Sequence, residues 1–438
     1  MNRKIIAAII MSSCLLGSAL ASDNRTAPNV FTSGSTISSS QMNENFNFLA
    51  SEMREKSVYC DNGETISDAI NAGYNWLTIY GTCDGAIMVY KFDPSPFGIN
   101  FSDMSNKPIS HLIIKGGDAD RAATIKNTAG GTAGGMHSMV VLGGFLQLHN
   151  VTFNDQLNVS DGSVLMAHEV NYEVLNGESA KLGVYGASYI SLNNTSISAE
   201  VQISTGSVAN IKSSTLNAVE SDGEALSLER NSHGELEEES TVNGKINLSQ
   251  SSTLDEKNST INCSATYSCI VSNNSGLAMS GTTITCSDTT STCVSVSNSS
   301  HLNLNQATIT GGQYNAIELG YSSSGEIRDT TITANGTTGG INLRKNSSLR
   351  VENTNVQTSD GTALYVNNFS SIEINNSTFS RTNFSIDNST PTVSAGSFAI
   401  LDVWGASSAL EYLSCYGGNI SVNIGQEVTA SPTSGGCD

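Results

Sequence analysis

A short phrase of alternating apolar residues recurs along most of this chain and limits its fold more than any other feature. Each copy has two apolar residues at alternate positions, a turn residue, a spacer, a hydroxyl residue and a closing apolar residue, as in Leu304-Asn305-Gln306-Ala307-Thr308-Ile309. The closing residues lie 19 to 26 positions apart, at Phe153, Tyr172, Ile197, Leu216, Val242, Ile261, Ile284, Ile309, Ile332, Val356 and Phe379. A period in this range, with strand-like alternation inside it, predicts a β-solenoid.

Aligning the copies on the closing residue predicts what each column does. The position three before the closing residue holds Asn, Asp or Gly, which tolerate a left-handed backbone, so a tight corner is predicted there. These residues are Asn150, Asn194, Asn258, Gly281, Asp329, Asn353 and Asn376. Five and seven positions earlier stand aliphatic residues, whose shared parity predicts the interior face. A second strand is expected to begin at Ile270, Val294, Ile317, Ile341 and Leu364. Just before it lies a column of small residues, namely Cys269, Cys293, Ala316, Gly340 and Ala363.

The opening coil carries a more specific pattern. The run from Cys60 to Ile66, then Ala69-Ile70 and the run from Ile79 to Cys83, resembles the first coil of secreted right-handed parallel β-helix proteins of the pectate-lyase-like superfamily. With the later copies the resemblance covers residues 58 to about 395. It implies an all-β, single-stranded right-handed parallel β-helix. It implies no one activity, because that superfamily includes polysaccharide lyases, glycoside hydrolases, phage tailspikes and adhesins.

The two ends of such a solenoid expose unpaired strand edges, which need caps. Met42, Phe46, Leu49 and Met53 form one apolar stripe at helical spacing, so a short helix is predicted over residues 41–55, either as a cap or as a coiled-coil neck for an oligomer. The expected organisation is then a signal peptide, a polar segment with the capping helix, irregular first coils, regular rungs and a C-terminal cap, over residues 1–21, 22–57, 58–139, 140–395 and 396–438.

Residues 1–21 indicate export. Arg3 and Lys4 precede an apolar stretch that ends at Ala19-Leu20-Ala21, a small-residue cleavage pattern. Lipid modification at Cys14 is an alternative. No later segment has about 18 consecutive apolar residues, so no transmembrane helix is expected. Without the signal the chain keeps 18 basic and 40 acidic side chains, a net charge of −22. So negative a protein disfavours nucleic acid as a partner.

The cysteine count also fits an oxidising compartment, because eight cysteines remain outside the signal. Sequential pairing predicts Cys60–Cys83 and Cys415–Cys437 at the two ends. The four central cysteines form two columns, Cys263 with Cys286 and Cys269 with Cys293. Bonds within a rung (Cys263–Cys269 and Cys286–Cys293) are favoured over bonds between rungs (Cys263–Cys286 and Cys269–Cys293), and both remain open.

Three groups of residues are candidates for chemistry on the outer surface. A uronic-acid lyase of this fold needs cationic groups, and the best local set is Arg328, Arg344, Lys345 and Arg350. They are interleaved with carboxylates, so surface ion pairs are the competing interpretation. An acidic stretch could supply oxygen ligands for calcium or carboxylates for acid–base catalysis through Glu235, Glu237, Glu238, Asp255 and Glu256. The competing interpretation is a solvated face. His149 and His168 align in neighbouring rungs, which is a two-histidine metal arrangement or a pair of surface polar residues.

A fourth candidate is a polar ladder on one sheet. Thr occupies the positions one before and one after the closing residue in three successive rungs, at Thr283, Thr285, Thr308, Thr310, Thr331 and Thr333. Such Thr-x-Thr arrays resemble the ice-binding faces of β-solenoid antifreeze proteins, although Thr also simply favours exposed strands.

These patterns lead to three hypotheses for function. The first is a secreted, non-catalytic protein that binds carbohydrate or another extracellular surface through its long polar sheet and requires no cofactor. The second is a polysaccharide lyase or glycoside hydrolase. The third is an ice-binding protein. Regular rungs without long inserted loops favour the first, since enzymes build clefts from such loops.

Overall fold

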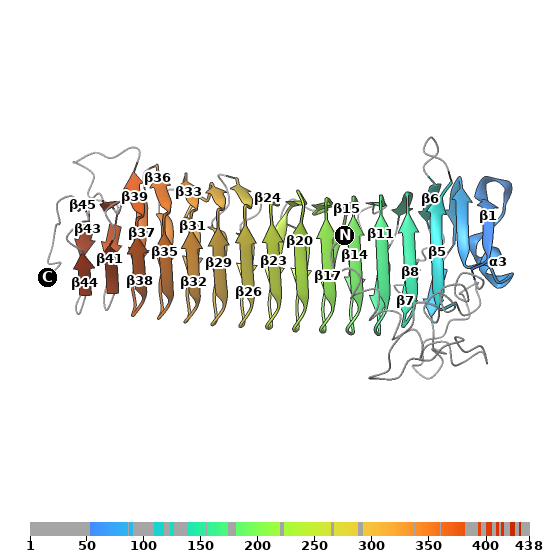
Figure 1. Ribbon diagram of the computed structural model, residues 1–438, viewed down its shortest axis with the longest axis horizontal. Helices are drawn as coiled ribbons and strands as arrows, with labels where there is room; N and C mark the ends of the chain where they lie inside the picture. Colours follow the sequence, from blue (N-terminus) through green and yellow to red (C-terminus); the bar gives the residue numbers. More distant parts are fainter. Residues whose placement is uncertain are drawn as a thin grey trace, which may run out of the picture.

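The computed structural model contains three parallel β-sheets that wind around one axis (Figure 1). The residues it describes are 53–85, 87–90, 109–117, 123–126, 139–154, 156–173, 181–219, 223–263, 267–287, 292–335, 339–359, 361–381, 393–395, 400–404, 409–410, 413–415, 421–424 and 429–430. Within these ranges no helix has the length and apolar character needed to cross a bilayer.

Within the described residues the first sheet, sheet A, has 16 strands. Its strands are β1 (Glu55–Tyr59), β2 (Trp76–Tyr80), β5 (His111–Gly116), β8 (Phe145–His149), β11 (Val164–His168), β14 (Tyr189–Asn193), β17 (Val208–Lys212), β20 (His233–Glu237), β23 (Thr253–Lys257), β26 (Gly276–Ser280), β29 (His301–Asn305), β32 (Ser324–Arg328), β35 (Ser348–Glu352), β38 (Ser371–Asn375), β41 (Ile400–Trp404) and β44 (Ser421–Ile424).

The second sheet, sheet B, has 15 strands and follows sheet A in each turn. Its strands are β3 (Thr82–Asp84), β6 (Ala123–Lys126), β9 (Val151–Asn154), β12 (Asn171–Glu173), β15 (Ser196–Ser198), β18 (Thr215–Asn217), β21 (Thr241–Asn243), β24 (Thr260–Cys263), β27 (Thr283–Cys286), β30 (Thr308–Thr310), β33 (Thr331–Ala334), β36 (Asn355–Thr358), β39 (Thr378–Arg381), β42 (Ala409–Leu410) and β45 (Thr429–Ala430).

The third sheet, sheet C, has 14 strands and completes each turn. Its strands are β4 (Ile87–Tyr90), β7 (Met139–Leu142), β10 (Leu157–Ser160), β13 (Lys181–Val184), β16 (Glu200–Ile203), β19 (Glu224–Leu228), β22 (Lys245–Leu248), β25 (Tyr267–Val271), β28 (Thr292–Val296), β31 (Asn315–Leu319), β34 (Gly339–Leu343), β37 (Thr362–Val366), β40 (Val393–Ala395) and β43 (Leu413–Cys415). One rung is one strand from each sheet.

The register confirms the column of closing residues predicted from the sequence. All eleven, from Phe153 to Phe379, pair in one unbroken row along sheet B. Every one of them is buried. The aliphatic pairs of sheet A, such as Leu146 and Leu148, are buried as well. One rung cannot bury its own apolar side, so stacking at about 4.8 Å builds the continuous core.

In most described rungs the corner between sheets A and B contains a single left-handed residue, whereas the corner between β20 and β21 contains two, Glu238 and Glu239. Asn150, Asn194, Asn258, Gly281, Asp329, Asn353 and Asn376 all have φ between 48° and 66°, as predicted. Where the side chains permit, the corners bond to each other, and Asn353 Nδ2 donates to Asp329 Oδ1 at 3.1 Å. The corner between sheets C and A uses two residues, most often both with positive φ, such as Asn273-Asn274.

Two buried ladders of hydroxyl groups run beside these corners and escaped the sequence analysis. The first precedes sheet A and consists of Ser163, Ser188, Ser207, Ser232, Ser252, Ser275, Ser300, Ser323, Ser347 and Ser370, all buried. The second precedes sheet B and consists of Thr195, Ser214, Ser240, Ser259, Thr282, Thr330, Thr354 and Ser377, also buried. A hydroxyl can satisfy backbone groups that the turn leaves without a ladder partner.

Ser300 illustrates how one member of the first ladder is held. Its Oγ donates to the carbonyl of Ser297 at 2.6 Å and accepts the N–H of Ser275, from the preceding rung, at 3.2 Å. We predict that Ser300→Ala lowers the free energy of unfolding by about 1–3 kcal/mol, because the Ser275 N–H becomes a buried donor with no acceptor. Urea unfolding followed by circular dichroism measures this. Ser295→Ala, on the outer side of β28, is the matched control and should change stability by less than about 0.5 kcal/mol.

The N-terminal rung is closed by local structure and a disulfide. A short helix, α3 (Ile66–Asn71), follows the first strand, and its N-cap Thr65 accepts the N–H of Asp68. A 3-10 turn, η1 (Cys60–Asn62), precedes it, and Cys60 is bonded to Cys83 with a Cα–Cα distance of 5.0 Å. Residues 41–52 of the helix predicted over 41–55 lie outside the described residues. The last three residues of that prediction are wrong, because Met53 and Arg54 have no regular secondary structure and Glu55 begins strand β1.

The structure confirms one of the two predicted cysteine columns and contradicts the other. Cys263 pairs with Cys286, as predicted, but Cys269 pairs with Val294 and not with Cys293. Cys269 therefore takes the inward position that the sequence analysis gave to Ile270, and Ile270 is only half-buried. The loop before β25 is two residues shorter than the loop before β28, whereas the alignment of Cys269 with Cys293 allowed a difference of one. A shift of one residue exchanges inner and outer faces. Only Cys293, Ala316, Gly340 and Ala363 form the small-residue column.

The disulfide pairing follows from this geometry. Cys286 and Cys293 are bonded within their rung, with a Cα–Cα distance of 5.9 Å. Cys263 and Cys269 are present as buried thiols, so the second within-rung bond is absent from this structure. Neither bond between rungs is formed. Cys437 lies outside the described residues, so the predicted Cys415–Cys437 bond is not described.

The solenoid continues beyond residue 395. Strand β41 pairs with β38, and β44 pairs with β41, in the same parallel register as the earlier rungs. In Figure 1 the last strands extend the stack in line with the others.

Candidate functional site

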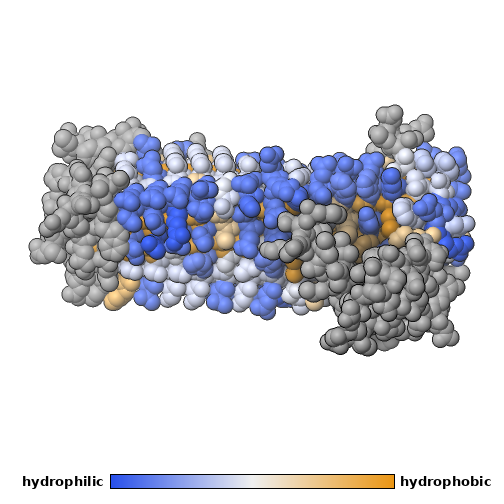
Figure 2. All heavy atoms as spheres, in the orientation of Figure 1, coloured by the Kyte–Doolittle hydropathy of each residue, from blue (hydrophilic) through white to orange (hydrophobic). Residues whose placement is uncertain are grey.

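The outer face of sheet A changes character along its length. Figure 2 shows hydrophilic residues gathered over the strands toward the C-terminus, whereas nearer the N-terminus apolar residues are visible between hydrophilic ones. In one outward column Glu326, Arg350 and Glu373 follow each other in successive rungs, and in the next column Arg328 precedes Glu352. Alternating charges at strand spacing are expected to pair across the rungs.

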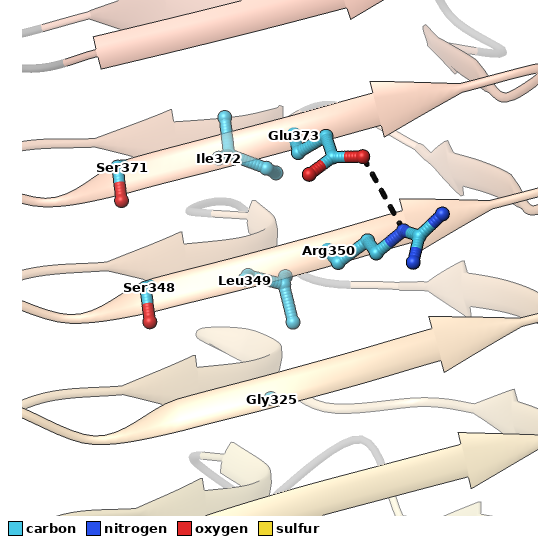
Figure 3. A pocket seen from close by; sticks show the side chains of 7 residues that line it. All are labelled: Gly325, Ser348, Leu349, Arg350, Ser371, Ile372 and Glu373. Carbon is cyan, nitrogen blue, oxygen red and sulfur yellow. Dashed lines mark ion pairs between the residues drawn. The ribbon is translucent and has the colours of Figure 1, made fainter.

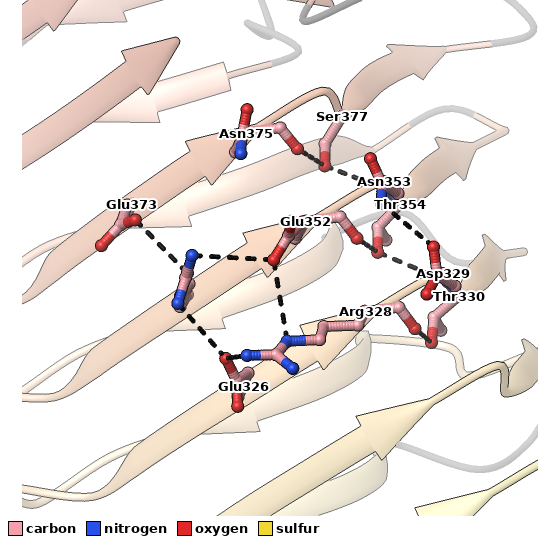
Figure 4. A network of polar contacts seen from close by, with 11 residues as sticks. Glu326, Arg328, Asp329, Thr330, Glu352, Asn353, Thr354, Glu373, Asn375 and Ser377 are labelled. Atoms are coloured by element: carbon pink, nitrogen blue, oxygen red, sulfur yellow. Dashed lines mark hydrogen bonds and ion pairs between the residues drawn. The ribbon is translucent and has the colours of Figure 1, made fainter. Parts of the chain in front are cut away.

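The two arginines of this face are held by three carboxylates (Figure 4). The Arg328 guanidinium lies 2.5 Å from Glu326 and 3.7 Å from Glu352. Arg350 lies 3.3 Å from Glu373, 3.6 Å from Glu352 and 3.7 Å from Glu326. Both arginine side chains face outward and are more than two-fifths exposed, which confirms the orientation predicted for Arg350. The ion-pair interpretation of these residues is thus the one that the contacts support.

The other two candidate cations lie elsewhere. Arg344 and Lys345 occupy the turn from sheet C to sheet A, where Arg344 pairs with Glu318 and Lys345 donates to the Tyr321 hydroxyl. The Lys345 ammonium also lies 3.7 Å from the centre of the Tyr321 ring, a cation–π contact. The hydrogen bond from Lys345 and its positive charge lower the pKa of Tyr321. The four cations therefore divide into two sites, and each is already engaged by the protein.

A shallow hollow of about 310 Å³ lies beside the ion pairs (Figure 3). It is lined by Gly325, Ser348, Leu349, Arg350, Ser371, Ile372 and Glu373. Gly325 belongs to the inward column between Leu302 and Leu349, so it contributes only backbone to the lining of the hollow. Its only cation is Arg350, which is bound to Glu373, so the hollow offers a carbohydrate polar edges but no unengaged base.

The acidic stretch does not converge on one point. Glu235 and Asp255 are neighbours in register on the outer face, and Glu235 accepts from Asn210 at 2.9 Å and lies 3.5 Å from His233. Glu238 pairs with Lys212 at 2.5 Å, and Glu237 is in register with the same lysine. These contacts match the solvated face better than a calcium site, which needs several oxygens around one centre.

Glu256 contradicts its assignment to the outer surface. It occupies the inward column of sheet A between Leu236 and Met279 and is 3% exposed. Both carboxylate oxygens are buried with no hydrogen-bond partner, and burial raises the pKa of Glu256 to about 8. The rule that residues five positions before the closing residue point inward already placed it there, five before Ile261.

Two thiols share the interior with this carboxyl group. Burial, together with the nearby Cys263 and Glu256, raises the pKa of Cys269 well above its usual value. Since the thiolate is the reactive form of cysteine, this environment keeps Cys269 unreactive as a nucleophile. The cluster is therefore part of the core.

The threonine ladder is assembled as the sequence predicts. Thr283 pairs with Thr308 and Thr308 with Thr331, while Thr285 pairs with Thr310 and Thr310 with Thr333. The first column continues toward the N-terminus through Thr260, Thr241 and Thr215. In those earlier rungs the second column holds Asn217, Asn243 and Asn262, whose amides hydrogen-bond from rung to rung at 2.8 and 2.9 Å. Sheet B thus presents two straight columns of hydroxyl and amide groups.

The two aligned histidines are also brought together. His149 ends β8, His168 ends β11, and their ring centres lie 4.9 Å apart, edge to face. Glu169, which sequence analysis missed, lies at the corner after His168, and its carboxylate is 3.9 Å from His149 Nε2. The signal in the sequence was a Glu in the corner column, where Asn is usual. Within the described residues these three are the group of His, Cys, Asp and Glu whose ligand atoms lie close enough together to share a metal ion.

Comparison with known proteins supports the fold. Residues 284–401 match the family described as "Right handed beta helix region". No curated protein sequence matches the chain. Among solved structures, the chain is similar to one titled "Geobacillus virus E2 - ORF18", with 10% sequence identity, a TM-score of 0.16, and coverage of 94% of this chain and 68% of that one.

Proposed function

We propose that this right-handed parallel β-helix protein is exported and acts without catalysis, by binding carbohydrate through the outer face of sheet B. The observation that carries the proposal is the pair of outward columns from Thr215 to Thr333, which place a hydroxyl or an amide group at the same two positions of every rung. The columns are about 6.6 Å apart and the rungs about 4.8 Å apart, so the face is a regular grid of hydrogen-bonding groups.

The chemistry of the grid suits a glycan. A threonine hydroxyl both donates and accepts hydrogen bonds, and its methyl group offers an apolar contact, which matches the mixed hydroxyl and C–H surface of a sugar ring. Thr283, Thr285, Thr308 and Thr331 are exposed, whereas the Asn side chains of the earlier rungs already bond to each other. The three rungs with paired threonines are therefore the part of the face best placed to bind a ligand.

Catalysis has less support. The candidate cations Arg328, Arg344, Lys345 and Arg350 are all engaged with carboxylates or with Tyr321. A lyase requires a base that is not already neutralised and a cleft that orients the polymer. Export is supported by the predicted signal and by the Cys60–Cys83 and Cys286–Cys293 disulfides, which persist in oxidising compartments.

We predict that Thr308→Tyr and Thr331→Tyr each weaken polysaccharide binding at least about tenfold, because a ring in place of a methyl and a hydroxyl interrupts the grid without disturbing an exposed strand. A glycan array identifies the ligand, and affinity electrophoresis measures the change. The control is Asn303→Tyr, which lies on the outer side of sheet A in the same rung as Thr308 and should leave binding unchanged. Equal binding by Thr308→Tyr and the wild type would remove sheet B as the site.

A cleavage assay on the polysaccharide that binds distinguishes the binding protein from an enzyme. Release of unsaturated or reducing ends from a polysaccharide, abolished by Arg350→Ala, would replace the binding proposal with a lyase or hydrolase at the hollow beside Glu373.

One observation favours ice binding as a second candidate. The Thr-x-Thr pairs of β27, β30 and β33 are in register, so six hydroxyls form a flat array. Thermal hysteresis that is lost in Thr308→Tyr, together with the absence of glycan binding, would establish it. Normal freezing at high protein concentration would exclude it.

A further inference from the structure

We propose that His149, His168 and Glu169 bind one zinc ion on the outer edge of sheet A, independently of the threonine face. One ligand atom from each of the three side chains lies within 4.8 Å of the others. Two imidazole nitrogens and one carboxylate oxygen are a ligand set that zinc accepts, with a water completing a tetrahedral site. Hard cations such as calcium and magnesium prefer oxygen ligands alone, so they fit this set poorly.

The solenoid itself holds the two imidazoles at the required separation. His149 and His168 are direct partners in register, each the last residue of its strand. In-register stacking of parallel strands keeps such neighbours about 4.8 Å apart at the backbone. In a tetrahedral zinc site, ligand atoms about 2.0–2.1 Å from the metal are about 3.4 Å from each other, so rotations of the side chains close the site without movement of the rungs.

The hydrogen bond made by His168 also supports metal binding. His168 Nδ1 lies 3.3 Å from the carbonyl oxygen of Asn193, in the next rung. A metal-binding histidine commonly donates its second N–H to a carbonyl, which fixes the ring and leaves the other nitrogen for the metal. His149 Nδ1 is buried and has no hydrogen-bond partner, whereas Nε2 of the same ring faces Glu169 at 3.9 Å. Nε2 is therefore the nitrogen of His149 that is placed to bind an ion shared with Glu169.

The surroundings keep the site open to a metal from solution. The His149 and Glu169 side chains are 33% and 46% exposed. On the far side of His149 the ladder continues with Lys115, which is exposed and can turn its ammonium group into solvent away from the ion.

The solenoid offers variants that remove ligands and keep the fold. His168→Asn introduces the residue found at the same position in the next rung, Asn193. Glu169→Asn introduces the corner residue of both neighbouring rungs, Asn150 and Asn194, which have the same left-handed backbone. Both variants should melt at the wild-type temperature in the absence of metal.

Isothermal titration of tag-free, chelator-treated protein with zinc chloride tests the proposal. We expect one zinc ion per chain for the wild type, at least a hundredfold weaker binding for His168→Asn and at least tenfold weaker binding for Glu169→Asn. Cobalt(II) should give the intense visible bands of a tetrahedral site in the wild type only. The control His301→Asn removes an outward imidazole of sheet A that contacts Ser324. It should bind zinc like the wild type.

Two results would overturn the proposal. One is the absence of saturable zinc binding to the wild type at millimolar metal. The other is wild-type affinity in a folded His168→Asn variant. Equal affinity for calcium would show an unselective cation surface and would also count against a zinc site.

Discussion

Replacing Glu256 with Met is expected to stabilise the protein, and the gain should grow as the pH rises. The side chain stands in the inward column between Leu236 and Met279, and neither oxygen has a hydrogen-bond partner. Methionine has a similar length and no charge to desolvate, so it fits the column between two apolar neighbours. Burial raises the pKa of Glu256 from 4.5 to about 8, so the charged form is strongly disfavoured in the folded protein.

The sign of the pH dependence follows from proton binding. Between pH 4.5 and about pH 8 the folded protein holds the Glu256 proton, whereas the unfolded chain has released it. The contribution of this group is therefore fully present below pH 4.5 and is lost as the pH rises toward 8. Converting the pKa difference gives a loss of about 3 kcal/mol between pH 5 and pH 8.

Urea unfolding at pH 5 and pH 8 measures this effect as a difference between proteins. The wild type should lose more stability over this interval than Glu256→Met, and more than Glu256→Gln, which keeps the shape and cannot ionise. Asp255→Asn is the matched control, because Asp255 is the outward neighbour on the same strand and should keep the pH dependence of the wild type. An identical pH dependence in the wild type and Glu256→Gln would contradict an inward carboxyl group.

Removal of the Cys60–Cys83 disulfide is expected to destabilise the N-terminal rungs by about 3 kcal/mol. The bond closes a loop with a sequence separation of 23 and joins η1 to β3. Without it, only strand pairing and the packing of α3 hold the first rung, and a solenoid unravels from its ends because each rung contacts only its neighbours. The variant is Cys60→Ala with Cys83→Ala.

Thermal melting and amide hydrogen exchange should locate the loss. We expect a lower melting temperature and faster exchange confined to β1, β2 and β3, while the rungs beyond β8 keep their protection. The control is Cys286→Ala with Cys293→Ala, which opens a loop with a separation of only 7 inside the stack. Its faster exchange should be limited to β27 and β28. Unchanged protection at β1 to β3 in the first variant would show that the disulfide does not hold the N-terminal end.

Much of the candidate surface could be predicted from the order of residues. The threonine columns, the outward arginines and the alignment of His149 with His168 all follow from counting back or forward from the closing apolar residue. Counting works here because parallel in-register stacking converts a position within the repeat into a position on the surface. The same rule places Glu256 in the interior, because it lies five residues before Ile261, but its charge suggested the outer face.

Other features depended on contacts that the repeat does not encode. Cys269 lies inward because the loop before β25 differs in length, and loop length sets the register of the strand that follows. The Ser and Thr ladders recur at a fixed place, yet the sequence does not state that hydroxyls such as those of Ser300 and Ser377 accept an N–H from the preceding rung. The arginines could be predicted to face outward, but their neutralisation depends on carboxylates of other rungs.

The sequence by itself determined that this chain is a stack of β-strand coils, which residues fill its interior and where each coil turns, because these features repeat with the chain and depend on local parity and backbone preference. Only the tertiary structure decided which outward side chains meet, such as Glu169 with His149 or Arg350 with three carboxylates. These contacts join residues that are in many cases about 20 or more positions apart. Their distances depend on the register between rungs and on side-chain rotamers, which the sequence of one repeat does not specify.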